Sequence, residues 1–236
     1  MTKCEIKYAP KHIDDVVFNN PENERRLKMI FQGFKTRHLF LSGTNGVGKT
    51  MISDLVVHHL TNHCPCLLIE DPIEKIMAQE DLYIYFLNAI HFAKLAGATS
   101  GDRLVLVFHE LDTYTKPLDK LWTVMDRMKD ELLVIITTNN PMKFVNAVRS
   151  RCAKYNFTRI TPEEFVCRAQ YILKQENIDL PDAHVLHYLK TMSVTTSDVR
   201  DYLDVLDDLI YSSQNNLPLP AIPVPQPKHP TLSVAK

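Results

Sequence analysis

The stretch of sequence that decides the fold is Gly43-Thr44-Asn45-Gly46-Val47-Gly48-Lys49-Thr50. It agrees with the phosphate-binding pattern G-x-x-x-x-G-K-[ST] at every fixed position. An apolar segment at 38–42 precedes it, and apolar residues at helical spacing follow it over 51–62. A strand, a glycine-rich turn and a helix place backbone amides and the positive end of a helix dipole around an anion. The sequence therefore predicts a nucleoside triphosphate site here, and the flanking segments disfavour the alternative of a chance match.

The residues of this loop have predicted roles. Glycine at 43, 46 and 48 lets backbone N–H groups close on the phosphates, because no Cβ intervenes. Lys49 is expected to reach the β- and γ-phosphates, and Thr50 to offer its hydroxyl to Mg²⁺. The full set of loop residues expected to contact ATP is Gly43, Thr44, Asn45, Gly46, Val47, Gly48, Lys49, Thr50 and Met51.

The composition is that of a packed protein with no bulk charge signal. Hydrophobic residues make up 45% of the 236 residues, charged residues 23%, and the net charge is −1. Any nucleic-acid surface would therefore be a local patch. Five scattered cysteines and no recognisable secretory signal favour a reduced, intracellular protein of the cytoplasm, nucleoid or nucleus. No apolar run approaches the ~20 residues that span a bilayer, so no membrane partner is expected.

The order of apolar runs predicts an α/β fold. Strands are expected at 38–42, 64–69, 104–108, 132–136 and 155–160, alternating with helices that include 79–96 and 118–129. Such alternation predicts a parallel five-stranded sheet flanked by helices, with ligands at the carboxyl ends of the strands.

The composition changes after Ile160. Thr161-Pro162-Glu163-Glu164 has the residues of a capping box, and three helices are expected over 163–175, 182–192 and 198–212. We predict a nucleotide-binding domain at 1–160, a small three-helix lid domain at 161–213 and a tail at 214–236. The tail is proline-rich from 217 onward, and its composition leaves open a plain disordered segment or a docking motif.

Polar residues follow the predicted strand at 104–108. Glu110 is placed to polarise an attacking water. At position 109, an aspartate would steady the hydration shell of Mg²⁺, but the residue is His109, whose neutral imidazole accepts a hydrogen bond without bringing negative charge. Two interpretations remain open: weakened Mg²⁺ binding or turnover, or a tolerated substitution in which Asp112 or water fills the gap.

Asn139 follows the next strand. Its amide is expected near the γ-phosphate or the attacking water. An ordinary turn asparagine ahead of Pro141 is the alternative.

Taken in order, these motifs resemble those of AAA+ ATPases. They are Tyr8-x-Pro-Lys-x-x-Asp-Asp-Val-Val17, the phosphate loop, His-Glu-x-Asp112, Thr-x-Asn139 and Ser150-Arg-Cys152. Within that family, the chain is similar to the ATPase subunits of sliding-clamp loaders, a group with the replication factor C small subunit and a phage subunit. The similarity covers about residues 4 to 211.

The resemblance implies further roles and partners. Glu110 would be the catalytic glutamate and Asn139 the first sensor. Arg151 would be an arginine finger that reaches the ATP of a neighbouring subunit, and Arg200, in the segment 197–200, would be the second sensor. The segment Tyr8 to Val17, with Tyr8, Val16 and Val17, would line the adenine pocket. The implied cofactors are ATP and Mg²⁺, and the implied partners are other AAA+ subunits, DNA and a sliding clamp.

Three departures from the family pattern accompany the resemblance. His109 stands in place of the aspartate, and Ala9 in place of an arginine. Clamp-loader subunits carry a third, helical collar domain, whereas this chain turns proline-rich after about residue 213, so we expect no collar and assembly through the AAA+ modules or other chains. Family members hold the DNA backbone on an inner ring face. The candidate contacts are Lys75, Lys94, Lys116 and Lys120.

Three functions follow from these observations. The first is a clamp-loader-like ATPase of DNA replication or repair. The second is an ATP-dependent assembly protein of helicase-loader or transposition type with weak or no hydrolysis, suggested by His109 and the expected lack of a collar. The third, a small P-loop kinase, is disfavoured by the sensor strand, the Ser-Arg-Cys segment and the helical lid.

Overall fold

The computed structural model describes residues 3–34, 36–63, 65–97, 99–100, 103–144, 146–192 and 198–219. Cys64, Ser197 and the proline-rich segment from 220 to 236 lie outside the described residues, and the predictions made for them stay predictions.

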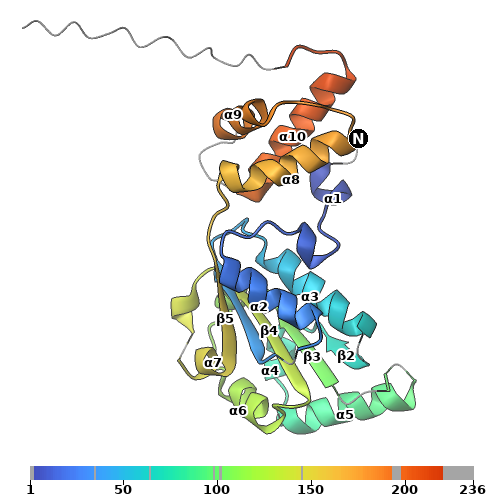
Figure 1. Cartoon of the computed structure of the whole chain (residues 1–236). Coiled ribbons are helices and arrows are strands. Elements are labelled where there is room, and N and C mark those ends of the chain that lie inside the picture. Colours follow the sequence, from blue (N-terminus) through green and yellow to red (C-terminus); the bar gives the residue numbers. More distant parts are fainter. Residues whose placement is uncertain are drawn as a thin grey trace, which may run out of the picture.

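A parallel sheet forms the centre of the described chain, with strand order β2-β3-β4-β1-β5 (Figure 1). The strands are β1 (His38–Gly43), β2 (Cys66–Ile69), β3 (Arg103–Phe108), β4 (Leu132–Thr138) and β5 (Cys152–Phe157). Every residue of β4 is buried, as expected for a strand covered on both faces. The predicted α/β fold with a parallel sheet of five strands is confirmed.

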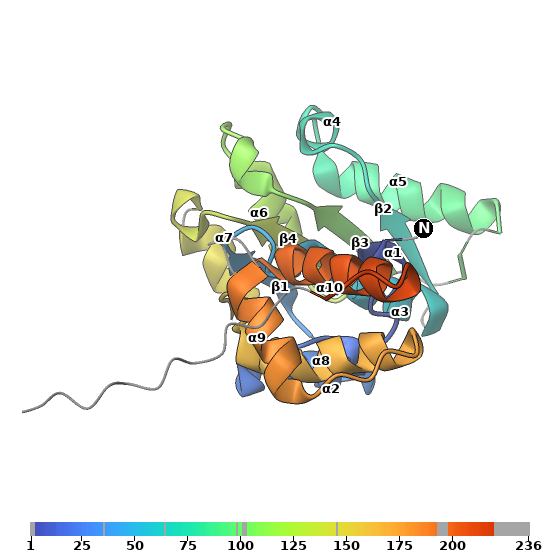
Figure 2. The same ribbon diagram turned by 90° about the horizontal axis from the view of Figure 1, so that it is seen from above.

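Helices cover both faces of the sheet (Figure 2). One face packs against α2 (Pro21–Phe31) and α3 (Lys49–His63) through a cluster that includes Leu27, Ile52 and Val105. The other face packs against a second group of helices through a cluster that includes Phe86, Leu106 and Leu121. These helices are α4 (Ile73–Met77), α5 (Leu82–Leu95), α6 (Asp119–Arg127) and α7 (Asn146–Arg151).

A third hydrophobic cluster belongs to the helical region that follows the sheet. Its helices are α8 (Pro162–Gln175), α9 (Asp182–Met192) and α10 (Val199–Gln214), and Figure 1 shows them above the sheet. We call this region the lid. The short helix α1 (Cys4–Lys7) also joins it, because Cys4 is buried in the lid cluster and its N–H donates to Asp207 at 2.9 Å. The expected domain division at residue 160 stays a prediction.

Local sequence signals set several helix starts. Asn20 accepts hydrogen bonds from Glu22 and Asn23, ahead of Pro21. The capping box at Thr161 is present: its hydroxyl accepts from the N–H of Glu164, whose carboxylate accepts from the N–H of Thr161 at 2.7 Å.

Several predicted bounds were wrong. The last strand is Cys152–Phe157 and not 155–160, because the chain enters the sheet directly after α7, where Cys152 pairs with His38. Ile160 has already left the sheet and is buried in the lid cluster. The helix predicted at 79–96 begins at Leu82, because Asp81 caps it by accepting hydrogen bonds from two backbone N–H groups. Helices α1 and α4 were not predicted.

Across the ranges described, the helices are all too short or too polar to cross a bilayer.

Candidate nucleotide-binding site

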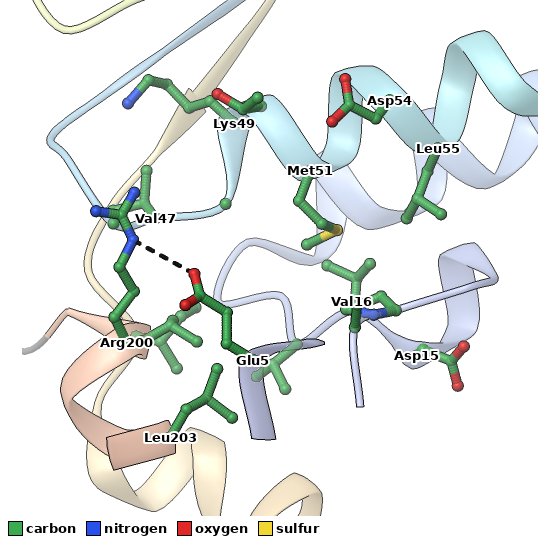
Figure 3. A pocket seen from close by; sticks show the side chains of 18 of the residues that line it. Glu5, Asp15, Val16, Val47, Lys49, Met51, Asp54, Leu55, Arg200 and Leu203 are labelled. Carbon is green, nitrogen blue, oxygen red and sulfur yellow. Dashed lines mark ion pairs between the residues drawn. The ribbon is translucent and has the colours of Figure 1, made fainter. Parts of the chain in front are cut away.

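A cavity of about 930 Å³ lies between the lid and the carboxyl edge of the sheet (Figure 3). Its walls come from the loop between β1 and α3, the segment 5–17, the end of β4 and the start of α10. The lining residues that the sequence predicted are Tyr8, Val16, Val17, Asn45, Gly46, Val47, Gly48, Lys49, Thr50, Met51, Glu110 and Arg200.

The other predicted residues do not line this cavity. Gly43 and Thr44 form the start of the loop, and His109 and Asn139 follow strands β3 and β4 at the same sheet edge. Arg151 ends α7 at the opposite edge. The structure thus gathers the predicted site residues at the carboxyl edge of the sheet, with one exception, Arg151.

Two glycines of the loop lie where an added side chain would meet a neighbouring segment. A Cβ on Gly43 would lie 2.2 Å from the carbonyl oxygen of Phe157 in β5. A Cβ on Gly46 would lie 1.9 Å from the carboxylate of Asp198 in the lid, and Gly46 has a φ of +74°. The first glycine lets two strands meet, and the second lets the lid rest on the loop.

Lys49 is a buried cation at the start of α3. The residue is only 7% exposed, and its Nζ donates to the carbonyl oxygen of Thr44 at 2.7 Å. Burial lowers the pKa of Lys49, and the nearby carboxylates of Glu110 and Asp112 oppose that effect. A buried ammonium beside backbone amides at a helix N-terminus fits a phosphate group.

Glu110 has an unusual backbone conformation. Its φ is +48°, in the left-handed region that is rare for residues with a side chain. Its N–H donates to the hydroxyl of Thr137 in β4 at 3.0 Å, which fixes the turn after β3. The turn exposes Glu110 to the cavity.

The ends of β3 and β4 are joined through Asp112. Its Oδ1 accepts from the hydroxyl of Thr138 at 3.0 Å and from the N–H of Asn139 at 3.2 Å. Asp112 therefore positions the strand end that carries Asn139.

Asn139 has an unpaired acceptor. Its Oδ1 is buried and has no hydrogen-bond partner within the described ranges. A buried carbonyl without a donor is costly, and a water or ligand in the site can supply that donor. This orphaned oxygen fits the water-orienting role expected of Asn139.

The lid contacts the loop directly. The N–H of Val199 donates to the carbonyl oxygen of Gly46 at 3.4 Å, and Asp198 caps α10 by accepting from the N–H of Arg200 at 2.9 Å. Figure 3 shows Arg200 and Lys49 extending toward the same end of the pocket. Arg200 Nε lies 4.0 Å from Glu5 Oε1, and the arginine side chain is 67% exposed.

The segment 8–17 forms another wall. The hydroxyl of Tyr8 donates to Glu176 Oε1 at 2.5 Å, and Arg168 of α8 donates to the Tyr8 carbonyl oxygen at 2.9 Å. Burial raises the pKa of Tyr8. Val16 packs against the sheet cluster and Val17 against the lid cluster, so this wall joins the two.

Arg151 lies at the amino edge of the sheet. Its Nε donates to Asp126 Oδ1 at 2.7 Å, its Nη2 bonds the other carboxylate oxygen, and its Nη1 donates to the Ala147 carbonyl oxygen at 2.6 Å. Phe157, which pairs with Gly43, is the last residue of β5 and lies six positions after Arg151. At about 3.3 Å per residue this is roughly 20 Å, so Arg151 is out of reach of its own pocket.

Local partners are identified for Lys75 and Lys120 among the candidate DNA-contacting lysines. Lys75 Nζ forms an ion pair with Asp71 at 2.8 Å, and Lys120 Nζ donates to the carbonyl oxygen of Gln79 at 2.8 Å. Lys94 lies on α5 and Lys116 before α6.

Sequence reasoning missed several site residues. Asp54 lines the cavity from α3, and its Oδ1 lies 3.8 Å from Nε2 of His109. Asp54 comes four residues after Thr50 on the predicted helix, and this spacing was the available signal. The sequence gives no signal for Thr137 or Asp198, because their contacts depend on the packing of distant segments.

The site holds the parts of a magnesium-dependent triphosphate site without a cage of protein ligands. In the ranges that the structure describes, no group of three or more His, Cys, Asp and Glu residues forms a metal-binding cluster. Mg²⁺ is commonly held by one or two protein groups together with phosphate oxygens and water, and the hydroxyl of Thr50 and the carboxylate of Asp54, which line the cavity, are oxygen groups of the kind it takes.

Fold and site define an ATPase class. Residues 39–159 match the ATPase family associated with various cellular activities (AAA), and the chain belongs to that family.

Curated relatives give a narrower similarity. The chain is 25% identical over 205 residues to the replication factor C small subunit of Staphylothermus marinus, covering 85% of this chain and 59% of the relative. It is 26% identical over 176 residues to replication factor C subunit 4 of Saccharomyces cerevisiae, covering 73% and 53%. The chain thus spans between half and three-fifths of the length of these relatives. The resemblance to the replication factor C small subunit covers most of this chain.

Solved structures share the fold. The Thermotoga maritima RuvB Holliday junction branch migration motor superposes with a TM-score of 0.62 at 15% identity, covering 89% of this chain and 68% of that one. A mutant of RuvB from the same organism gives a TM-score of 0.64 at 14% identity, with the same coverage.

Proposed function

We propose that this chain is an ATP-hydrolysing subunit of a clamp-loader-like assembly that acts on DNA in replication or repair. Membership of the AAA family supports nucleotide binding and ATPase chemistry. Relatives named replication factor C small subunit support the clamp-loader assignment, and neighbouring AAA+ subunits, DNA and a sliding clamp are its proposed partners.

In this proposal, the residues around the cavity have different roles in hydrolysis. Lys49 and the amides of the loop bind the phosphates, and Arg200 approaches them from the lid. Glu110 orients the attacking water and accepts its proton, and the unpaired Oδ1 of Asn139 accepts a hydrogen bond from that water. Thr50 and His109 would help to hold Mg²⁺, which when bound would supply positive charge to offset that of the phosphate oxygens.

The observation that carries the proposal is the position of Arg151. A guanidinium at the amino edge of the sheet cannot reach a pocket at the carboxyl edge of the same molecule, about 20 Å away. In the proposed assembly, Arg151, which Asp126 holds with its side chain 28% exposed, would serve the pocket of a neighbour instead. An arginine supplied in trans stabilises transition-state charge only when the neighbour docks, which makes hydrolysis depend on assembly.

The test is complementation between two inactive variants. Lys49→Ala retains the arginine but loses phosphate binding, and Arg151→Ala retains the pocket but loses the arginine. We expect each variant alone to hydrolyse ATP poorly in the presence of primed DNA, and an equimolar mixture to regain activity. Arg149→Ala, the same charge change two residues earlier on α7, is the control and should behave like the unmodified protein.

Two results would contradict this proposal. One is wild-type turnover per molecule that is independent of both protein concentration and DNA. The other is full activity of Arg151→Ala on its own.

A further inference from the structure

His109 leaves the magnesium side of the pocket without a strand-end carboxylate. In the structure, Oδ1 of Asp54 lies 3.8 Å from Nε2 of His109, so a carboxylate stands beside the ring. Asp54 lies on α3 and not on a strand, so this carboxylate reaches the site from a different element.

The position of Asp54 on α3 points toward the metal. Thr50 and Asp54 are four residues apart, so they lie one turn apart on the same face of the helix. Both line the cavity, and Figure 3 shows Asp54 on α3 a turn beyond Lys49. The sequence Lys49–His63 contains no other acidic residue.

A simple surface ion pair is the competing explanation. The Asp54 side chain is 64% exposed and that of His109 40%, and a pair this open contributes little to folding stability. A stabilising role therefore does not account for the arrangement. Carboxylates paired with a histidine ring commonly orient that ring toward a metal and increase its basicity.

We propose that Asp54, acting through His109, supplies the carboxylate charge of the magnesium site. Asp54 is then a positioning residue: its carboxylate orients the ring of His109 and adds a negative charge beside Thr50. This inference rests on the proposed function, because it concerns the metal that accompanies ATP in the same pocket.

The test measures Mg²⁺ dependence of nucleotide binding, without hydrolysis. Fluorescent mant-ATPγS is held at a fixed concentration and Mg²⁺ is titrated. We expect Asp54→Asn to raise the Mg²⁺ concentration for half-maximal binding by about tenfold or more, the range found for residues that support metal ligands. Asp204→Asn removes an exposed carboxylate on α10 outside the cavity and should leave the Mg²⁺ requirement unchanged.

A second background makes the test specific. His109→Asp places a carboxylate directly after β3, so adding Asp54→Asn to it should change the Mg²⁺ requirement by much less than in the wild type, about twofold at most. An equal effect of Asp54→Asn in both backgrounds, or none in the wild type, would overturn the inference. Asp54→Ser replaces the asparagine variant should that protein not fold.

The two proposals fail differently. The protein could show Mg²⁺-dependent nucleotide binding that is sensitive to Asp54 and yet not hydrolyse ATP with primed DNA. That result would contradict the proposed function and support this inference.

Discussion

The two edges of the sheet differ in whether their polar groups are paired and their backbone is relaxed. At the carboxyl edge, Asn139 keeps a buried oxygen unpaired among the described residues, and Glu110 adopts a left-handed backbone conformation. At the amino edge, Arg151 has its guanidinium bonded to Asp126 and to a backbone carbonyl, and the ring of His38 accepts from the N–H of Val134 at 3.1 Å. Unpaired and strained groups thus lie at the edge where we propose that the nucleotide binds, and the arginine proposed to act on a neighbouring subunit lies at the edge where polar groups are paired.

The largest expected effect comes from the carboxyl edge. Glu110→Gln keeps the size of the side chain but removes the proposed base, so we expect ATP turnover to fall by about 10²–10⁴-fold with nucleotide affinity retained. Steady-state hydrolysis and equilibrium binding measure the two quantities. Glu131→Gln, just before β4 at the other edge, is the control, and an equal loss there would remove the contrast between the edges.

Next is a substitution where the loop meets β5. Gly43→Ala places a methyl group 2.2 Å from the Phe157 carbonyl oxygen, so we expect a loss of about 1–3 kcal/mol in the free energy of unfolding, measured with urea. Gly97→Ala tests strain alone, because Gly97 has a φ of +70° and nothing within 4 Å of its added Cβ. If both variants lose the same stability, the close approach of the strands is not the cause.

A smaller effect is expected at the amino edge. Asp126→Ala removes the partner of Arg151, but the pair is half-exposed, with side-chain exposures of 56% and 28%. We expect a change of about 0–1 kcal/mol in the free energy of unfolding, together with a larger change in turnover, because the arginine loses its fixed orientation. A change in stability above that range without a change in turnover would mean that the pair serves only the fold.

The smallest expected effect concerns pH. Burial lowers the pKa of His38, and a hydrogen bond to the Met125 backbone opposes this. His38 is therefore protonated more readily in the unfolded chain than in the folded protein. The free energy of unfolding decreases as the pH falls below the ordinary histidine pKa of about 6.5. We expect Tm to drop less between pH 7.5 and 5.5 in His38→Asn than in the wild type. An unchanged drop would show that another group dominates acid sensitivity.

Local patterns predicted most of the fold. The fixed residues of the phosphate loop placed β1 and α3, and the apolar runs at 104–108 and 132–136 placed the buried strands β3 and β4, because such runs depend little on distant partners. The last strand was misplaced because its start depends on pairing between Cys152 and His38, more than a hundred residues apart.

The candidate site was predicted unevenly for a related reason. Lys49 and Glu110 each belong to a short motif whose residues are close together in the chain, so the sequence could identify them. The link between Asp112 and Asn139, and the contact of Asp198 with Gly46, exist only once separate elements have packed. The pairing of Asp54 with His109 falls between these cases, since helical spacing indicates the face but not the partner.

The segment from Cys4 to Val17 has a mechanical consequence. It is anchored in the lid through Cys4 and through the Tyr8 bonds to Arg168 and Glu176, while Val16 packs against the sheet. A movement of α8–α10 away from the loop would therefore also move the cavity wall formed by residues 8–17. The resemblance places the adenine against this wall. We therefore expect base selectivity and the rate of product release to change together when the wall moves.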